Sequence, residues 1–172
     1  MIPPSPARTG RPVRFAVCLL VFAGCAALLF LDHIQYFSLP YFWDELGQFV
    51  PSALDILRDG AWVPHSAVPN AHPPGVMAYL ALVWSVFGYS IPATRAAMLA
   101  LASALVFVSF LLANRLSRRT SYTAAYLAIL LLVADPLFHA QAMMAQLDMP
   151  AALFSTLALL LFLNDRQGWA VA

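Results

Sequence analysis

The sequence has 172 residues, of which 62% are hydrophobic and only 10% are charged. A soluble domain of this size is about half apolar and about a quarter charged, so the composition excludes an ordinary soluble core. The formal net charge of +1 offers no electrostatic attraction for nucleic acid. We therefore expect an all-α integral membrane protein, with membrane lipids as its surroundings and no nucleic-acid partner.

The chain begins with a proline-rich segment, residues 1–14, which we expect to be a cytoplasmic tail. Arg8, Arg11 and Arg14 end this tail, and an apolar run from Phe15 to Leu31 follows. A cleaved signal peptide starts in the same way. The apolar run is long, however, and further apolar segments follow it, so we expect the run to be a retained membrane span.

Four apolar stretches have, or nearly have, the roughly 20 residues that a membrane-spanning helix needs. They are Phe15–Leu31, Ile91–Ala113, Tyr122–His139 and Ala151–Leu163. A fifth stretch, Gly75–Tyr89, is shorter. The sequence therefore predicts about four transmembrane helices.

The arginine residues predict the orientation, because short loops rich in arginine stay in the cytoplasm. Three of them precede the first span, and Arg115, Arg118 and Arg119 follow the second. The chain must then cross the membrane an even number of times between these two points. We therefore expect Gly75–Tyr89 to lie along or dip into the outer surface, within a long outer loop of residues 32–90. This topology is typical of a multi-pass protein of the cell inner membrane.

The remaining loops follow from this orientation. Gln141–Pro150 is expected to be a short outer turn, and residues 164–166 lie inside. Residues 168–172 look like the start of a further span, so we expect residues 15–172 to be the N-terminal part of a larger transmembrane domain.

The outer loop contains a predicted amphipathic helix that suits a membrane surface. Apolar residues recur at helical spacing from Leu46 to Leu57, with a kink expected at Pro51 and an end at Gly60. The polar face is expected to carry Glu45, Gln48, Ser52, Asp55 and Asp59. Aromatic residues of the kind found at membrane–water boundaries flank this helix, namely Tyr36, Tyr41, Phe42, Trp43 and Trp62.

The expected topology gathers unusual polar residues on the outer face, namely Asp44, Glu45, His72, Arg95, His139, Gln146 and Asp148. Ionisable residues near hydrocarbon cost free energy and persist mainly where they pair or perform chemistry. Purely structural roles are the alternative: caps for Asp44 and Asp148, headgroup anchoring for Arg95, and a plain loop position for His72. Glu45 is expected to be solvated or a supporting partner. Asp135 and His139 fit a broken helix end, and His33 and His65 fit ordinary loop positions.

The order of these motifs resembles a known family. Phe42-Trp43-Asp44-Glu45 follows the first span, and His72-Pro73-Pro74-Gly75, Ala93-Thr94-Arg95-Ala96 and Gln146-Leu147-Asp148-Met149-Pro150 come next. The pattern is similar to that of glycosyltransferases with the GT-C fold, which use polyprenyl-phosphate sugars. These include the protein O-mannosyltransferases and the lipid A aminoarabinose transferases. Gly75 departs from the pattern, since relatives usually carry Leu there.

The resemblance implies a role for each matching position. Asp44 is the implied catalytic acid or base, Glu45 its support, and Asp148 a second acidic residue of the same pocket. Arg95 and His72 are implied to bind the donor phosphate. The implied partners are a polyprenyl-phosphate sugar and a lipid, glycan or protein acceptor. No cofactor is required, although Asp44 and Asp148 could share a divalent metal.

Two other classes of function remain open from the sequence. A transporter or flippase component also carries Asp, His and Arg in membrane segments, but at mid-span depth. A membrane scaffold without activity would leave the polar residues of the outer face dispersed.

Overall fold

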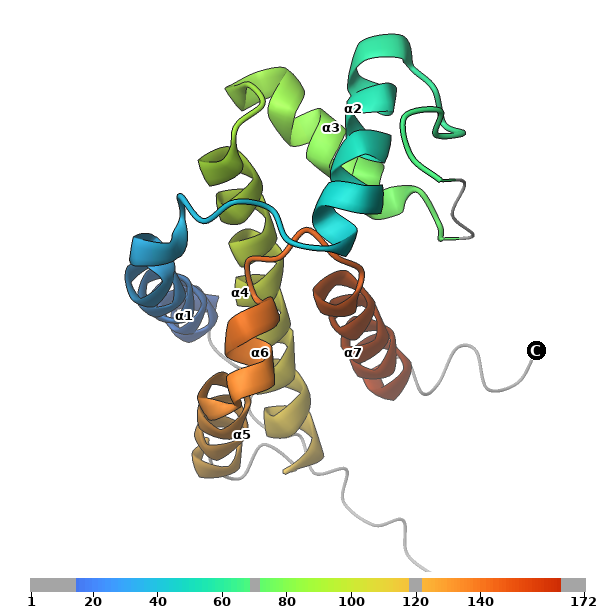
Figure 1. Cartoon of the computed structure of the whole chain (residues 1–172). Helices are drawn as coiled ribbons and strands as arrows, with labels where there is room; N and C mark the ends of the chain where they lie inside the picture. The colour runs from blue at the N-terminus through green and yellow to red at the C-terminus, as the bar shows by residue number, and fades with distance from the viewer. Residues whose placement is uncertain (1–14, 69–71, 118–121, 165–172) are drawn as a thin grey trace, which may run out of the picture.

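A computed structural model describes residues 15–68, 72–117 and 122–164 of the chain. These residues form an all-α structure of seven α-helices and two short helical segments (Figure 1). The α-helices are α1 (Phe15–His33), α2 (Val50–Asp59), α3 (Gly75–Phe87), α4 (Ile91–Leu116), α5 (Thr123–Ala134), α6 (Pro136–Gln141) and α7 (Asp148–Asn164). The segments η1 (Ile34–Tyr36) and η2 (Glu45–Phe49) are a 3-10 turn and a π-helical turn. The expected cytoplasmic tail, Arg118, Arg119 and the expected further span lie outside the described residues.

Helix α4 is the central element, and it joins two hydrophobic cores. Its N-terminal part, including Ala97 and Met98, packs with α2 and α3. Its later residues, including Leu99, Ala102 and Val106, pack with α1, α6 and α7. At ~1.5 Å per residue its 26 residues extend ~39 Å, which is long enough to serve both cores.

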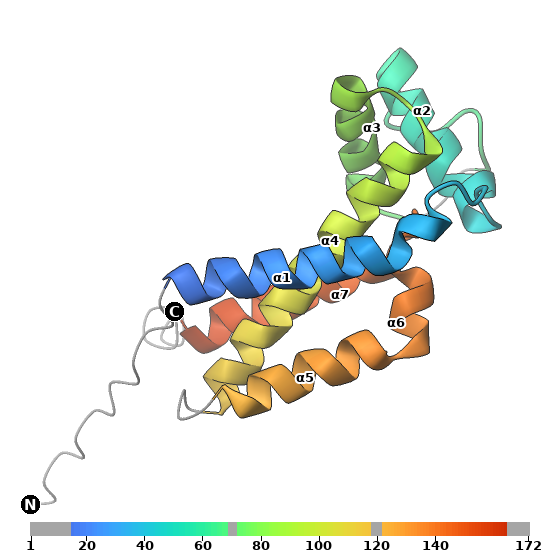
Figure 2. The ribbon, with the colours of Figure 1, turned by 90° about the vertical axis from the view of Figure 1, so that its left-hand side faces the viewer.

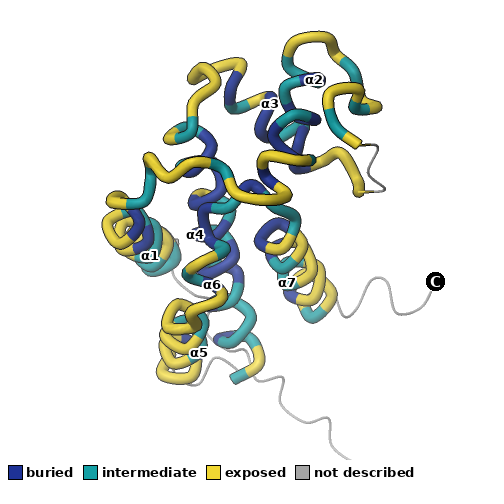
Figure 3. Tube along the Cα trace, in the orientation of Figure 1, coloured by how far each residue is buried: buried dark blue, intermediate teal, exposed yellow. Residues whose placement is uncertain are grey.

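Within the described part of the chain, two helical segments are long and apolar enough to cross a membrane, namely Ala16–Tyr36 and Ile91–Leu116. This statement rests on length and composition, a test that a buried core helix or a signal helix also passes. Helices α3, α5 and α7 are apolar but shorter. Figure 3 shows that much of α5 is exposed, whereas the middle of α4 is buried.

The helices have two distinct ends. Figure 2 shows the start of α1, the end of α4, the start of α5 and the end of α7 at one end of the bundle. The end of α1, α6 and the start of α7 lie at the other end, towards α2 and α3. Arg115 marks the first end, where its Nη2 donates a hydrogen bond to the carbonyl of Leu163 at 3.0 Å.

The predicted helix over residues 122–139 is broken in the structure. Helix α5 ends at Ala134, and the Asp135 side chain caps α6 by accepting from the backbone N–H of Leu137 at 2.9 Å. Pro136 occupies the first turn of α6, where its missing N–H costs nothing. The expected broken helix end is thus confirmed, and a single continuous helix over this range is wrong. Helix α7 begins at Asp148 and accommodates Pro150 in the same way.

The predicted amphipathic helix is present, but its polar face is not open to water. Pro51 lies in the first turn of α2, directly after the π-helical turn, and Gly60 ends the helix with φ +65°. Ser52 and Asp55 were expected on a solvated face, yet both are buried. The reason is the loop after Gly60, which folds back over α2 and supplies hydrogen bonds to Asp55.

Asp55 is the anchor of this loop. Its Oδ2 accepts hydrogen bonds from the backbone N–H groups of His65 at 2.8 Å and Ser66 at 2.9 Å, and its Oδ1 accepts from the Ser66 hydroxyl at 2.6 Å. Burial raises the pKa of the Asp55 carboxyl, but the hydrogen bonds from Ser66 and His65 outweigh burial, so the pKa is lowered overall. These bonds stabilise the ionised form.

Replacing Asp55 with asparagine is expected to lower the free energy of unfolding by roughly 2–3 kcal/mol at neutral pH, because bonds to a charged acceptor are lost. Since the folded-state pKa is lowered, wild-type Asp55 contributes stability above its ordinary pKa and loses it as pH falls through the folded-state value. The difference between the two proteins should therefore shrink in acid. Denaturant unfolding of both proteins at pH 7 and pH 3 measures the two free energies of unfolding. If their difference were the same at both pH values, the ionised Asp55 carboxylate would not be stabilised by these hydrogen bonds.

Candidate functional site

A buried ion pair between Glu45 and Arg95 is the centre of the candidate site. Glu45 begins η2, Arg95 lies in the second turn of α4, and their relative exposures are 0% and 2%. Arg95 Nη1 bonds to Glu45 Oε1, and Nη2 donates to Oε2 at 3.1 Å. This two-point geometry is the strong form of a carboxylate–guanidinium contact.

The remaining hydrogen bonds of the pair reach two further segments. Arg95 donates to the carbonyls of Met143 at 3.0 Å and Pro40 at 3.1 Å. Glu45 accepts from the backbone N–H of Ala145 at 2.7 Å and from that of Phe42 at 3.0 Å. We call this set the Glu45–Arg95 clamp. It joins residues 39–45, the start of α4 and the turn before α7.

The clamp corrects two expectations. Glu45 is not solvated: it is buried, and its carboxylate takes part in four hydrogen bonds within the chain. Arg95 does not anchor at headgroups, because its guanidinium is buried and both Nη atoms are bonded within the chain. Its Nε is buried with no hydrogen-bond partner among the described residues. A lipid phosphate would have to exchange for an existing bond to reach either Nη atom of Arg95.

Asp44 lies exposed, immediately before the clamp. It occupies the position before η2, but its side chain makes no capping hydrogen bond and its backbone is helical. The structural alternative of a capping Asp44 is therefore not supported. A carboxylate at this place is open to a substrate.

Trp43 shapes the turn that presents Asp44. Its φ of +43° is in the left-handed region, which costs a non-glycine residue roughly 1–2 kcal/mol. The turn is held by hydrogen bonds from Gly47 N–H to the Trp43 carbonyl at 2.9 Å and from Glu45 N–H to the Phe42 carbonyl at 3.0 Å. The Trp43 ring is 77% exposed and stacks on that of Phe42, with centroids 5.9 Å apart. Strained residues of this kind cluster at functional sites.

Asp148 lies exposed at the first position of α7, three residues after Ala145. Because Ala145 and Glu45 are hydrogen-bonded, the segments that carry Asp148 and Asp44 meet at the clamp. A carboxylate at a helix N-terminus also interacts favourably with the helix dipole, so a structural contribution accompanies any chemical one.

His72 is placed on another side of the η2 segment. Its ring lies 5.8 Å from that of Phe49, whose residue ends η2. A cavity of about 130 Å³ opens there between α2, α3 and the loop after Gly60. It is lined by Ser52, Ile56, Trp62, Val63, Pro64, His72, Pro74 and Met77. Asp44, Arg95 and Asp148 do not line this cavity. The structure therefore groups four predicted residues at or beside the clamp, Asp44, Glu45, Arg95 and Asp148, and sets His72 apart.

A second polar network lies beside the clamp and was not predicted. The Thr94 hydroxyl donates to the Ser90 carbonyl at 2.9 Å and accepts from Trp84 Nε1 at 3.0 Å. The Tyr41 hydroxyl, 2.6 Å from the same oxygen, must then be the donor. Burial raises the pKa of Tyr41 to about 12, so the phenol stays neutral. Arg95 Cζ lies 5.3 Å from the Tyr41 ring centroid, which adds a cation–π contact.

Neither Asp44 nor Asp148 belongs to a group of three or more side chains with metal-ligand spacing among the described residues, so a metal shared by the two gains no support. Among the described residues, the groups of three or more His, Cys, Asp or Glu side chains with metal-ligand spacing are Asp32–His33–His139 and Asp55–Asp59–His65. His33 was expected to be an ordinary loop residue, and this is wrong: it is the last residue of α1 and is fully buried. Helix α1 continues two residues beyond the predicted end of the span at Leu31, and this extension includes His33.

Comparison of the chain with protein-family models, with curated proteins and with solved structures finds no match in any of the three.

Proposed function

We propose that this chain forms part of a membrane-embedded glycosyltransferase that transfers a sugar from a polyprenyl-phosphate donor to an acceptor hydroxyl on the outer side of the membrane. The observation that carries the proposal is the Glu45–Arg95 clamp. It holds the Asp44 turn against the segment that leads into Asp148. Two exposed carboxylates are thereby presented at one end of an apolar helix bundle.

The proposal assigns membrane positions to the helices. Helices α1 and α4 have the length of full spans, and α5 with α6 and α7 supply the third and fourth crossings. Helices α2 and α3 then form an outer layer over the clamp, with the N-terminus in the cytoplasm of an inner membrane. The arginine at the opposite end of α4, Arg115, supports this orientation.

The geometry assigns different chemistry to the two residues of the acidic pair. Transfer requires that the acceptor hydroxyl lose its proton while the donor phosphate departs. Glu45 cannot serve as the base, because both its oxygens already accept hydrogen bonds in a dry site. Asp44 is exposed and is the base in this proposal, with Asp148 orienting the sugar or the acceptor. Arg95 acts as a positioning residue.

The transporter alternative predicts ionisable groups at mid-span depth. Among the described residues, the acidic, basic and histidine side chains of the long apolar helices lie near the helix ends: Asp32 and His33 in α1, and Arg95 and Arg115 in α4. Asp148 likewise starts α7. This distribution favours chemistry at the membrane surface over a path through the membrane.

A reconstitution assay tests the proposal. The protein, placed in liposomes with a polyprenyl-phosphate sugar, is expected to release polyprenyl phosphate and to glycosylate an added acceptor in equal amounts. Separation of the lipid products by chromatography measures both, and empty liposomes are the control. Movement of the intact donor across the bilayer without loss of the sugar would instead identify a flippase and contradict the transferase.

A further inference from the structure

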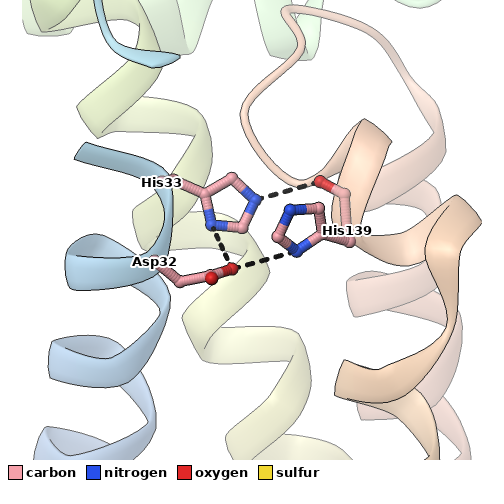
Figure 4. A group of neighbouring side chains, drawn as sticks. All are labelled: Asp32, His33 and His139. Atoms are coloured by element: carbon pink, nitrogen blue, oxygen red, sulfur yellow. Dashed lines mark hydrogen bonds and ion pairs between the residues drawn. The ribbon is translucent and has the colours of Figure 1, made fainter. Parts of the chain in front are cut away.

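Asp32, His33 and His139 converge where the end of α1 meets α6 (Figure 4). Asp32 Oδ2 lies 3.0 Å from His139 Nδ1 and 3.5 Å from His33 Nδ1. The two imidazole rings overlap, with centroids 4.3 Å apart. The break at Asp135-Pro136 is what turns α6 so that His139 reaches α1.

His33 has more acceptors around its ring than a neutral imidazole can satisfy. Its Nδ1 lies 2.9 Å from the Leu29 carbonyl and its Nε2 lies 3.0 Å from the His139 carbonyl. Carbonyl oxygens only accept, and a neutral ring has one N–H. If Nε2 donates to the His139 carbonyl, Nδ1 has a lone pair that faces the Leu29 carbonyl oxygen, an unfavourable contact. Nδ1 could exchange this contact for a metal ion on the side of Asp32 Oδ2, which lies 3.5 Å away. A metal-ligating histidine characteristically donates its other N–H to a backbone carbonyl in this way.

The spacing of the three side chains suits a small transition-metal ion. Zinc forms bonds of about 2.0–2.2 Å to nitrogen and carboxylate oxygen, so neighbouring ligands of a tetrahedral site lie about 3.3–3.5 Å apart. The two separations from Asp32 Oδ2, 3.0 and 3.5 Å, bracket this range. One ligand atom from each residue falls within 4.8 Å of the other two. To close the three ligands on one ion, His33 Nδ1 must turn from the Leu29 carbonyl towards Asp32 Oδ2.

A cavity lined by two of the three proposed ligands, His33 and His139, leaves room for a fourth ligand. It has a volume of about 270 Å³ and is lined by His33, Tyr36, Leu39, His139, Ala140 and Met143. A site with three protein ligands and one open position is the pattern that zinc shows where it binds water or substrate.

We propose that Asp32, His33 and His139 bind one divalent transition-metal ion of the Zn²⁺ type. The ion links α1 to α6, whose contacting residues His33 and His139 are 106 positions apart in the chain. A metal ion that links two positions so far apart in the sequence reduces the conformational entropy of the unfolded chain, which stabilises the folded state. The site also borders the clamp, since Arg95 bonds to the carbonyls of Leu39 and Met143, which line the same cavity. The metal site is independent of the transferase proposal.

Zinc binding to the purified full chain, stripped with a chelator, tests the site. Isothermal titration calorimetry is expected to find one equivalent of Zn²⁺ and a rise in thermal unfolding temperature. His139→Gln and Asp32→Asn, both at exposed or half-buried positions, should weaken binding more than about 100-fold, because each removes a ligand. His65→Gln is the matched control, since it alters the histidine of the Asp55–Asp59–His65 group. It should bind zinc as the wild type does.

Several results would overturn the proposal. Absence of zinc binding by the wild type would show that the three side chains contact one another without forming a metal site. Binding that persists in His139→Gln, or that is lost in His65→Gln, would place the ion elsewhere. Substitution with Co²⁺ gives a further readout: a thiolate charge-transfer band would assign the metal to Cys18 or Cys25, whereas its absence together with a tetrahedral visible spectrum supports the site.

Discussion

Replacing Arg95 with methionine is expected to lower the free energy of unfolding by about 3–5 kcal/mol. The substitution leaves the Glu45 carboxylate buried at 0% exposure without its cation, and removing one member of a buried pair carries a cost of this size. It also removes the donors to the Met143 and Pro40 carbonyls. Equilibrium unfolding in detergent, followed by near-ultraviolet circular dichroism, measures the loss.

The double variant Glu45→Gln with Arg95→Met distinguishes the cost of an unpaired buried charge from the cost of losing the other contacts of Arg95. It carries no buried charge at the clamp, so it should be more stable than Arg95→Met alone. Arg58→Met is the control, because Arg58 is an exposed arginine of α2 and its loss should change stability by less than about 0.5 kcal/mol. If Arg95→Met were as stable as this control, the clamp would not hold the outer loop.

Replacing Asp44 with asparagine is expected to lower the rate of sugar transfer by about 10²–10⁴-fold, the range over which a positioned general base contributes. Asparagine keeps the shape of aspartate but cannot take the acceptor proton. Stability should be almost unchanged, because Asp44 is exposed and makes no capping hydrogen bond. The measurement is the transfer rate at saturating donor, together with the unfolding midpoint.

Asp59→Asn is the matched control for Asp44→Asn. Asp59 is also an exposed carboxylate of the outer layer, at the end of α2, and its contact is with the exposed His65. The transfer rate of Asp59→Asn should match that of the wild type. A wild-type rate in Asp44→Asn would remove Asp44 from the reaction, whereas equal losses in both variants would indicate a general effect of charge.

The clamp explains how Asp44 could be sensitive to changes far along the chain. Its turn is attached through Glu45 to the start of α4 and to the segment before α7. Trp43 has a strained backbone with positive φ, and the hydrogen bonds of Glu45 to Arg95 and Ala145 hold the turn in this conformation. A substitution in the turn before α7 that breaks the Ala145–Glu45 bond should therefore act on Asp44 without touching it.

The helical elements follow from local patterns that the sequence carries by itself. Apolar runs predicted α1, α4 and α7 to within a few residues, and Gly60 predicted the end of α2 through its left-handed backbone. The break between α5 and α6 is readable from Asp135-Pro136, a capping residue followed by a residue without an N–H. These features could be predicted because each depends only on the hydropathy and backbone geometry of a short stretch of sequence.

What lies buried was decided by tertiary structure, because burial depends on which distant segment covers a residue. The sequence around Glu45 indicates a solvated residue. In the fold, Arg95, 50 positions along the chain, and the Ala145 N–H, 100 positions along the chain, both bond to the Glu45 carboxylate. Asp55 looks exposed until the loop of His65 and Ser66 folds over it. His33 becomes a candidate metal ligand only because α6 turns His139 towards α1. Composition and periodicity predicted the all-α elements and their order, whereas the pairing of charges across the chain required the fold.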